Sequence, residues 1–126
     1  MFQVVYEYRE PWPVEGALKV KAPALEGEIQ VPPDSARRRA NGYLARYVAL
    51  ALEAGEPMLI WGDRPYWRMS IYLNLRGFGQ VARLGEIVVD AMTREVLQLS
   101  KEQILEMQDR ADAIASRLTP ATRTAS

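Results

Sequence analysis

Residues 66–75 read YWRMSIYLNL, and two kinds of residue alternate strictly along them. The apolar set is Trp67, Met69, Ile71, Leu73 and Leu75. The other set is Tyr66, Arg68, Ser70, Tyr72 and Asn74. Successive residues of a strand lie on opposite faces of a sheet, so this period of two predicts a half-buried strand in an antiparallel sheet.

Further strands are predicted on both sides of this stretch. They are a strand at 58–61, a turn at 62–65, a turn at 77–79, a strand at 80–90 and a short strand at 96–99. Gly85 lies inside the strand at 80–90, where an isolated glycine indicates a β-bulge. Residues 90–94 then form a tight connection, and we expect Asp90 to accept hydrogen bonds from the backbone of its own turn. The region 58–99 is therefore predicted to be a β-meander.

A helix is predicted before this meander, at about 34–54. Asp34 or Ser35 can cap its first turn, and Gly55 is in the usual place for a C-terminal glycine. Small and apolar residues recur at helical spacing, which indicates one buried face. The pair Asn41-Gly42 inside this helix is locally unfavourable, by about 1 kcal/mol for the glycine relative to alanine. We interpret it as close packing against a neighbour, with a helix break or a subunit contact as alternatives.

A second helix is predicted after the meander, at 101–118. Ser100 and Gln103 form a capping box, and Leu99 with Ile104 forms a hydrophobic staple. The inner face is expected to carry Ile104, Met107, Gln108, Ala111, Ile114, Ala115 and Leu118. Thr119-Pro120 ends this helix, and residues 121–126 are expected to fray.

The N-terminal part, 1–31, is predicted to consist of strands. Residues 2–8 alternate like a strand, and residues 18–21 with 29–31 are expected to pair as a hairpin. Together these elements predict an α+β fold, an antiparallel sheet in the order strands–helix–β-meander–helix, with two helices packed on one face. We expect residues 1–120 to form a single domain.

Composition excludes several kinds of chemistry. The chain has 126 residues, 48% of them hydrophobic and 25% charged, as in an ordinary globular domain. It has no cysteine and no histidine, which excludes disulfides, the usual zinc ligands and the commonest catalytic base. We therefore expect a protein that is not an enzyme and that has no catalytic, cofactor or metal site. Apolar runs are too short for a membrane span and no signal-peptide pattern opens the chain, so the cytoplasm is the expected compartment.

Charge is balanced overall but uneven along the chain. Sixteen basic and sixteen acidic residues give a net charge of zero, while residues 34–83 hold eight arginines and four acids, a net of +4. The candidate basic patch is Arg37, Arg38, Arg39 and Arg46. Solvation and pairing with nearby acids is the favoured interpretation, and binding of phosphate or an acidic partner is the alternative. A regulatory nucleic-acid-associated protein using the arginine-rich segment 37–83 stays open, although the neutral total makes nucleic acid an unlikely partner.

Acidic residues offer one further cluster. Glu102, Glu106 and Asp109 share a face of the second helix at i, i+4 and i+7. We interpret them as a solvated outer face, because charged residues are normally exposed.

The polar face of the strand at 66–75 is the strongest functional indication. Its candidate partner-binding residues are Tyr66, Arg68, Tyr72 and Asn74. Tyrosine and arginine are enriched where proteins bind each other, so we expect a homodimer or a complex with a protein partner. Ordinary sheet surface, or coverage by Tyr6 or Tyr8, is an equally weighted alternative.

A small-molecule site is the second hypothesis. Its lining would be Trp12, Trp61, Trp67 and Tyr43. The competing interpretation is that these aromatic side chains simply fill the core.

The segment from Leu84 to Leu97, LGEIVVDAMTREVL, resembles the strand–turn–strand signature of PepSY-type domains. In that signature a strand ends in an aspartate, a tight turn with threonine and glycine follows, and the next strand begins after a glutamate. Arg94 is at the position where the signature has glycine. The resemblance implies a small α+β domain of an interaction or inhibitory kind, without catalytic residues.

Overall fold

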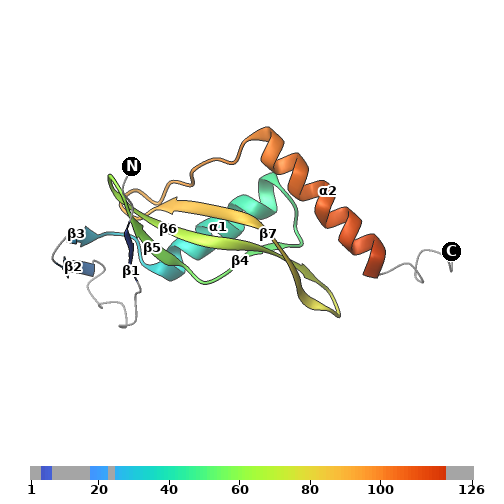
Figure 1. The fold of residues 1–126 in the computed structure, drawn as a ribbon, viewed down its shortest axis with the longest axis horizontal. Coiled ribbons are helices and arrows are strands. Elements are labelled where there is room, and N and C mark those ends of the chain that lie inside the picture. Colours follow the sequence, from blue (N-terminus) through green and yellow to red (C-terminus); the bar gives the residue numbers. More distant parts are fainter. Residues whose placement is uncertain (1–3, 7–17, 23–24, 119–126) are drawn as a thin grey trace.

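The computed structural model describes residues 4–6, 18–22 and 25–118. It has an α+β fold with antiparallel strands and two helices (Figure 1). The strands are β1 (Val4–Tyr6), β2 (Leu18–Ala22), β3 (Leu25–Ile29), β4 (Leu52–Ala54), β5 (Met58–Trp61), β6 (Pro65–Leu75) and β7 (Gly79–Asp90). The helices are α1 (Pro33–Tyr47) and α2 (Lys101–Leu118). The predicted fold class is confirmed.

The strand β6 is the centre of a five-stranded sheet. It pairs with β7 along one side over its whole length, and with β5 and β4 in succession along the other. Three residues, 55–57, separate Ala54 from Met58, whereas only two, 69 and 70, separate their partners Ile71 and Arg68. β4 and β5 are therefore one strand interrupted by one extra residue. Beyond β5 lies β1, while β2 and β3 pair only with each other.

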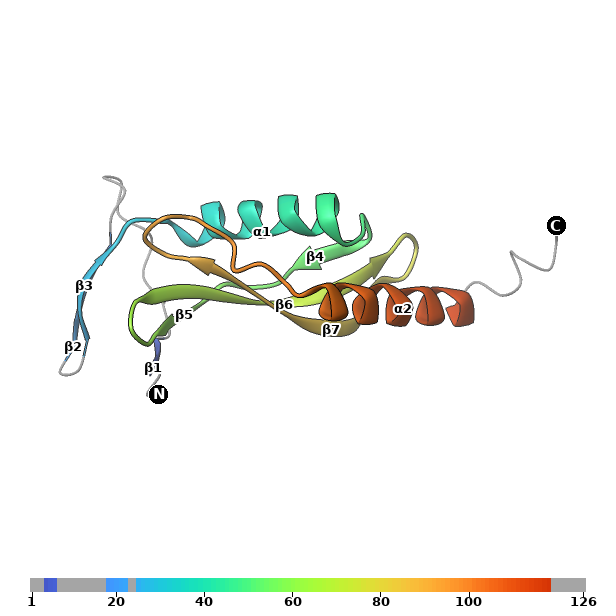
Figure 2. The same cartoon turned by 90° about the horizontal axis from the view of Figure 1, so that it is seen from above.

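Both helices pack on the same face of this sheet. The core-facing residues of β6 are Trp67, Met69, Ile71 and Leu73, and all are buried. Helix α1 covers them with Ala36, Ala40, Tyr43 and Leu44, and α2 adds Met107 and Ala111. Figure 2 shows α1 lying over the sheet, with α2 beside β7. Gly85 leaves room for the end of the Met107 side chain, because a Cβ there would lie 3.1 Å from Cε of Met107.

Several local predictions are confirmed. Residues 66–75 alternate between buried and more exposed positions as expected, up to Leu75 at the strand end. The register of β6 against β7 shifts at Gly85, which is the predicted bulge. The capping box is present, since Ser100 Oγ accepts from the Gln103 N–H at 3.1 Å and Gln103 Oε1 accepts from the Ser100 N–H at 2.8 Å.

The predicted helix at 34–54 is too long. It ends at Tyr47, and Leu52–Ala54 forms β4 instead, because pairing with β6 buries Leu52 and Ala54. Gly55 therefore does not terminate a helix. Neither Asp34 nor Ser35 caps the start, where Pro32 is the N-cap without a side-chain hydrogen bond. The fixed φ of Pro33 favours the first helical turn without such a cap.

Two strand predictions also need correction. The partner of β2 is Leu25–Ile29 rather than 29–31, and Val96 forms an isolated bridge to Val89 instead of a strand at 96–99. Residues 30 and 31 do not pair with β2, because both of their N–H groups donate to the Ala91 carbonyl. The ends of the predicted strand at 2–8, Trp12 and the expected tail at 121–126 lie outside the described residues.

The turn after β7 lies within the segment from Leu84 to Leu97. Asp90 Oδ1 accepts hydrogen bonds from the N–H groups of Met92 at 2.7 Å and Thr93 at 3.0 Å, as predicted for an aspartate in a turn. The Arg94 N–H donates to the Asp90 carbonyl at 2.9 Å, and Arg94 has φ +69°. An arginine thus adopts the left-handed conformation that glycine favours, at the position where the signature has glycine.

Replacing Arg94 with glycine is expected to stabilise the protein by about 1 kcal/mol, because glycine removes the steric cost of the left-handed backbone. Urea denaturation measures this change. Arg94→Ala is the matched control, since it removes the same charge and keeps the Cβ. Equal stability of the two variants would contradict the assignment of strain to Arg94.

Candidate functional site

The face of the sheet away from the helices is called the outer face here. It carries Tyr66, Arg68, Ser70, Tyr72 and Asn74 of β6, together with Glu53 and Ile60 on one flank and Arg83, Glu86 and Val88 on the other. Most of these side chains are partly exposed, whereas Ile60 is buried. All four candidate partner-binding residues lie on this face, as their alternation predicts.

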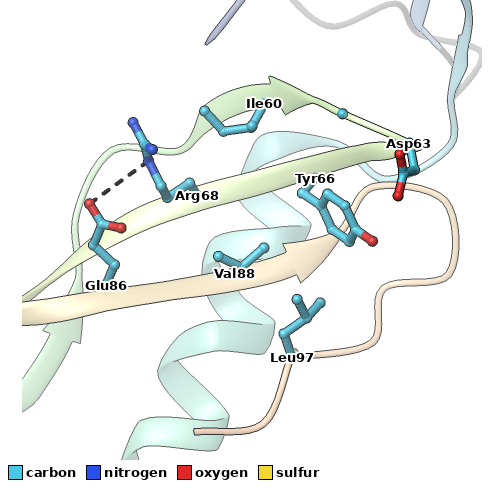
Figure 3. A pocket seen from close by; sticks show the side chains of 8 residues that line it. Ile60, Asp63, Tyr66, Arg68, Glu86, Val88 and Leu97 are labelled. Carbon is cyan, nitrogen blue, oxygen red and sulfur yellow. Dashed lines mark ion pairs between the residues drawn. The ribbon is translucent and has the colours of Figure 1, made fainter. Parts of the chain in front are cut away.

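One end of the outer face is hollowed into a groove of about 370 Å³, called the outer groove below. Its lining is Ile60, Gly62, Asp63, Tyr66, Arg68, Glu86, Val88 and Leu97. Figure 3 shows Tyr66, Val88 and Leu97 gathered at one end and the Arg68–Glu86 pair at the other. The groove therefore has a largely apolar half, with the exposed Asp63 beside Tyr66, and a charged half.

The charged half is a cross-strand network. Arg68 Nε lies 3.9 Å from Glu86 Oε1, and Arg83 Nη2 lies 2.9 Å from the same oxygen. Arg83 Nε also donates to Ser70 Oγ at 3.0 Å. These groups are partly exposed, so the network contributes little to stability. The long Arg68–Glu86 distance leaves Arg68 only weakly paired, whereas Glu86 is held closely by Arg83.

The side chains at the other end of the outer face make local contacts. A Cβ on Gly55 would lie 2.7 Å from Cε2 of Tyr72, so the Tyr72 ring covers the break between β4 and β5. Glu53 Oε1 accepts from Gln80 Nε2 at 3.0 Å. Hydrogen bonds from Gln80 and then Asn74 hold the pKa of Glu53 below its ordinary value. Tyr72 and Asn74 thus share the face with Tyr66 and Arg68 without lining the outer groove.

The sequence interpretation missed six of the eight residues that line the outer groove. They come from other parts of the chain: Ile60, Gly62, Asp63, Glu86, Val88 and Leu97. The pair Ile60↔Tyr66 depends on the β5 register, and Arg68↔Val88 depends on that of β7. Alternation along β7 is a signal for Val88, whereas nothing local in the sequence indicates Leu97.

The candidate basic patch does not form one surface. Arg37 Nε donates to the Ala54 carbonyl at 3.0 Å, while the Ala54 N–H donates to Asn41 Oδ1 at 2.7 Å. Arg37 and Asn41 therefore cover the outer edge of β4, which protects it from pairing with another strand. Arg38 and Arg39 are exposed, and the Arg46 guanidinium lies 5.5 Å from the Tyr47 ring centroid.

The packing interpretation of Asn41-Gly42 is wrong for the glycine. A Cβ on Gly42 would meet nothing within 4 Å. Asn41 has a clear role at the edge of β4, whereas nothing in the structure explains Gly42.

The aromatic residues proposed to line a small-molecule site lie mainly in the core. Trp67 is fully buried, and its Nε1 donates to the Val31 carbonyl at 2.7 Å. Tyr43 is buried in the same core, and Trp61 packs against that core. These positions are those that the core-filling interpretation predicts.

The described part of the chain gives no support for a metal site or for a membrane-spanning helix. Among the residues that the structure describes, no group of three or more acidic, histidine or cysteine side chains could hold a metal ion. Neither α1 nor α2 combines the length and apolar character needed to cross a membrane.

Comparisons with protein-family models, curated proteins and solved structures gave no match. The PepSY-type resemblance therefore stays a prediction.

Proposed function

We propose that this chain is a non-enzymatic protein-interaction module that self-associates through the outer groove. The observation that carries the proposal is the combination of an apolar half, Tyr66, Val88 and Leu97, with a charged half, Arg68 and Glu86. Protein interfaces have this composition, with an apolar centre beside polar groups and with tyrosine and arginine as anchors. The cytoplasm is the proposed compartment.

A second copy is a suitable partner because the charged half is self-complementary. In a two-fold dimer the same surface meets itself, so each group must find its partner on an identical face. Arg68 and Glu86 supply both signs of charge side by side. A two-fold axis near them lets Arg68 of each chain pair with Glu86 of the other while the apolar halves pack together.

The double variant Tyr66→Ala/Leu97→Ser is expected to raise the dissociation constant of the dimer about thirtyfold or more. The reason is that loss of an aromatic anchor costs about 2 kcal/mol or more of binding free energy. Sedimentation velocity over a dilution series measures the dissociation constant. Circular dichroism confirms that the variant folds.

The matched control is Leu50→Ser, which removes an apolar side chain that is 88% exposed and lies outside the outer groove. It should associate like the unmodified chain. If the double variant and the control associate equally well, the outer groove is not the interface.

A further inference from the structure

A methionine side chain lies against Arg68 on the outer face. Met58 is the first residue of β5 and is the direct cross-strand partner of Arg68 in β6. Directly opposed residues of two paired strands have their side chains on the same face of the sheet. Met58 is 41% exposed, and Arg68 Nη2 donates to its Sδ at 3.6 Å. A thioether and a guanidinium are therefore in contact beside the outer groove, which Arg68 lines.

Exposure and contacts set Met58 apart from the other methionines that the structure describes. The sequence has five methionines and no cysteine, so thioethers are its only sulfur groups. Met69 and Met107 are buried in the core. Met92 is 37% exposed in the turn after β7, but no donor among the described residues contacts its sulfur. Oxidants in solution therefore reach both Met58 and Met92, because oxidation of methionine follows exposure.

Oxidation would strengthen the contact between Met58 and Arg68. A thioether sulfur is a weak hydrogen-bond acceptor. In a sulfoxide the acceptor is instead a strongly polar oxygen, and a hydrogen bond from a charged donor is shorter and roughly twice as strong as one between neutral groups. Arg68 Nη2 is already within reach of the sulfur, so a rotation within the flexible methionine side chain brings the new oxygen to it.

A sulfoxide at Met58 also changes what holds the Arg68 guanidinium. In the unmodified chain Arg68 Nε lies 3.9 Å from Glu86 Oε1, and that same oxygen is held by Arg83 at 2.9 Å. Arg68 is thus only weakly paired within its own chain, which leaves it able to pair with Glu86 of a second copy. The sulfoxide oxygen draws the guanidinium toward β5 and away from that pairing.

Given the proposed function, on which this step rests, we propose that Met58 is a reversible oxidation site that weakens self-association. The oxidant is a peroxide. A lone pair of the Met58 sulfur attacks one oxygen of hydrogen peroxide, so that the S–O bond forms while the O–O bond breaks. The leaving hydroxide takes the proton of the transferred oxygen and becomes water. Sulfur loses two electrons and the peroxide gains them.

The reverse step needs an external reductant, because the chain has no thiol of its own. A methionine sulfoxide reductase supplies it. Two thiols are oxidised to a disulfide, the sulfoxide oxygen leaves as water, and the Met58 thioether returns. Arg68 is then free again for the pairing across the dimer.

Peptide mapping by mass spectrometry tests the site, after brief treatment of the folded full chain with hydrogen peroxide. Met58 and Met92 are expected to become sulfoxides. Met69 and Met107 should be converted less than about a tenth as far, because they are buried. Conversion of Met92 with Met58 left intact would overturn the proposal.

Proton–nitrogen NMR tests the contact with Arg68 and does not require a dimer. The Nε–H signal of Arg68 is expected to move when Met58 is oxidised, whereas that of Arg39, which is exposed on α1, should stay in place. The Met58→Leu variant is the control, since peroxide then leaves the Arg68 signal unmoved even though Met92 reacts. An Arg68 signal that is unchanged in the oxidised chain would contradict the proposed contact.

Sedimentation velocity over a dilution series tests the effect on association. Oxidation is expected to raise the dissociation constant about tenfold, because a two-fold dimer loses two exposed pairs between Arg68 and Glu86. Met58→Gln should weaken the dimer in the same direction without peroxide, since its amide oxygen accepts from Arg68. Met58→Leu cannot form the sulfoxide, so its dissociation constant should be the same before and after treatment.

Two results would overturn the regulatory effect. One is an unchanged dissociation constant after oxidation of Met58, and the other is an equal rise in the Met58→Leu variant. A chain that is monomeric before treatment contradicts the proposed function and the regulatory effect together. The peptide map and the Arg68 signal still decide, in that case, whether Met58 is an oxidation site held by Arg68.

Discussion

Replacing Asp90 with alanine is expected to lower the free energy of unfolding by about 3 kcal/mol. Asp90 is 7% exposed and is the single charged residue that is buried within residues 29–118. Arg64 contacts both of its oxygens, with Nε 2.8 Å from Oδ2 and Nη2 3.2 Å from Oδ1. Alanine would remove these contacts and the acceptor for the N–H groups of Met92 and Thr93 together.

Two companion variants separate these contributions, and urea denaturation measures each. Asp90→Asn keeps an oxygen for the turn amides and loses the charge, so about half of the destabilisation is expected. Arg64→Ala should cost about 1 kcal/mol, because that side chain is 45% exposed and water replaces part of its contact. A loss below about 1 kcal/mol for Asp90→Ala would show that the turn does not depend on this carboxylate.

Replacing Trp67 with alanine is expected to cost about 4 kcal/mol, the second large effect. Trp67 is fully buried at the centre of β6. Its removal leaves a cavity between the sheet and α1 and also deprives the buried Val31 carbonyl of its donor at 2.7 Å. Thermal and urea unfolding measure the loss.

Trp67→Phe distinguishes packing from the hydrogen bond. Phenylalanine keeps much of the ring and lacks the indole N–H, so a loss of about 2 kcal/mol is expected for the unpaired carbonyl and the smaller volume. Hydrogen exchange should rise at residues 30 and 31, which are tied to the Ala91 carbonyl beside that bond. If Trp67→Phe loses the expected stability but hydrogen exchange at residues 30 and 31 is unchanged, the hydrogen bond from Trp67 to the Val31 carbonyl does not hold this segment in place.

Much of the fold could be predicted because its strongest signals are local. Alternation over 66–75 gives the strand and its two faces, and the reciprocal bonds of Ser100 and Gln103 give the start of α2. The end of α1 could not be found this way. Residues 48–54 continue a helical pattern in the sequence, but Leu52–Ala54 gains more from pairing with distant residues of β6.

In the candidate site too, some residues could be predicted from a local pattern and others could not. Tyr66 and Arg68 were predicted from a single strand, because alternation alone places them on the outer face. Val88 faces Arg68 only through the bulged register of β7, and Leu97 reaches the outer groove through a bond from its N–H to the Val88 carbonyl. Such pairings depend on contacts between separate segments, which no local pattern encodes.

The molar mass of the unmodified chain in solution, measured by light scattering over a dilution series, tests the central claim most directly. Self-association through the outer groove predicts twice the 14.3 kDa of one chain at micromolar concentration, falling toward 14.3 kDa on dilution. A mass of 14.3 kDa at every concentration up to about 100 µM, corresponding to a binding free energy weaker than about −5.5 kcal/mol, would contradict it.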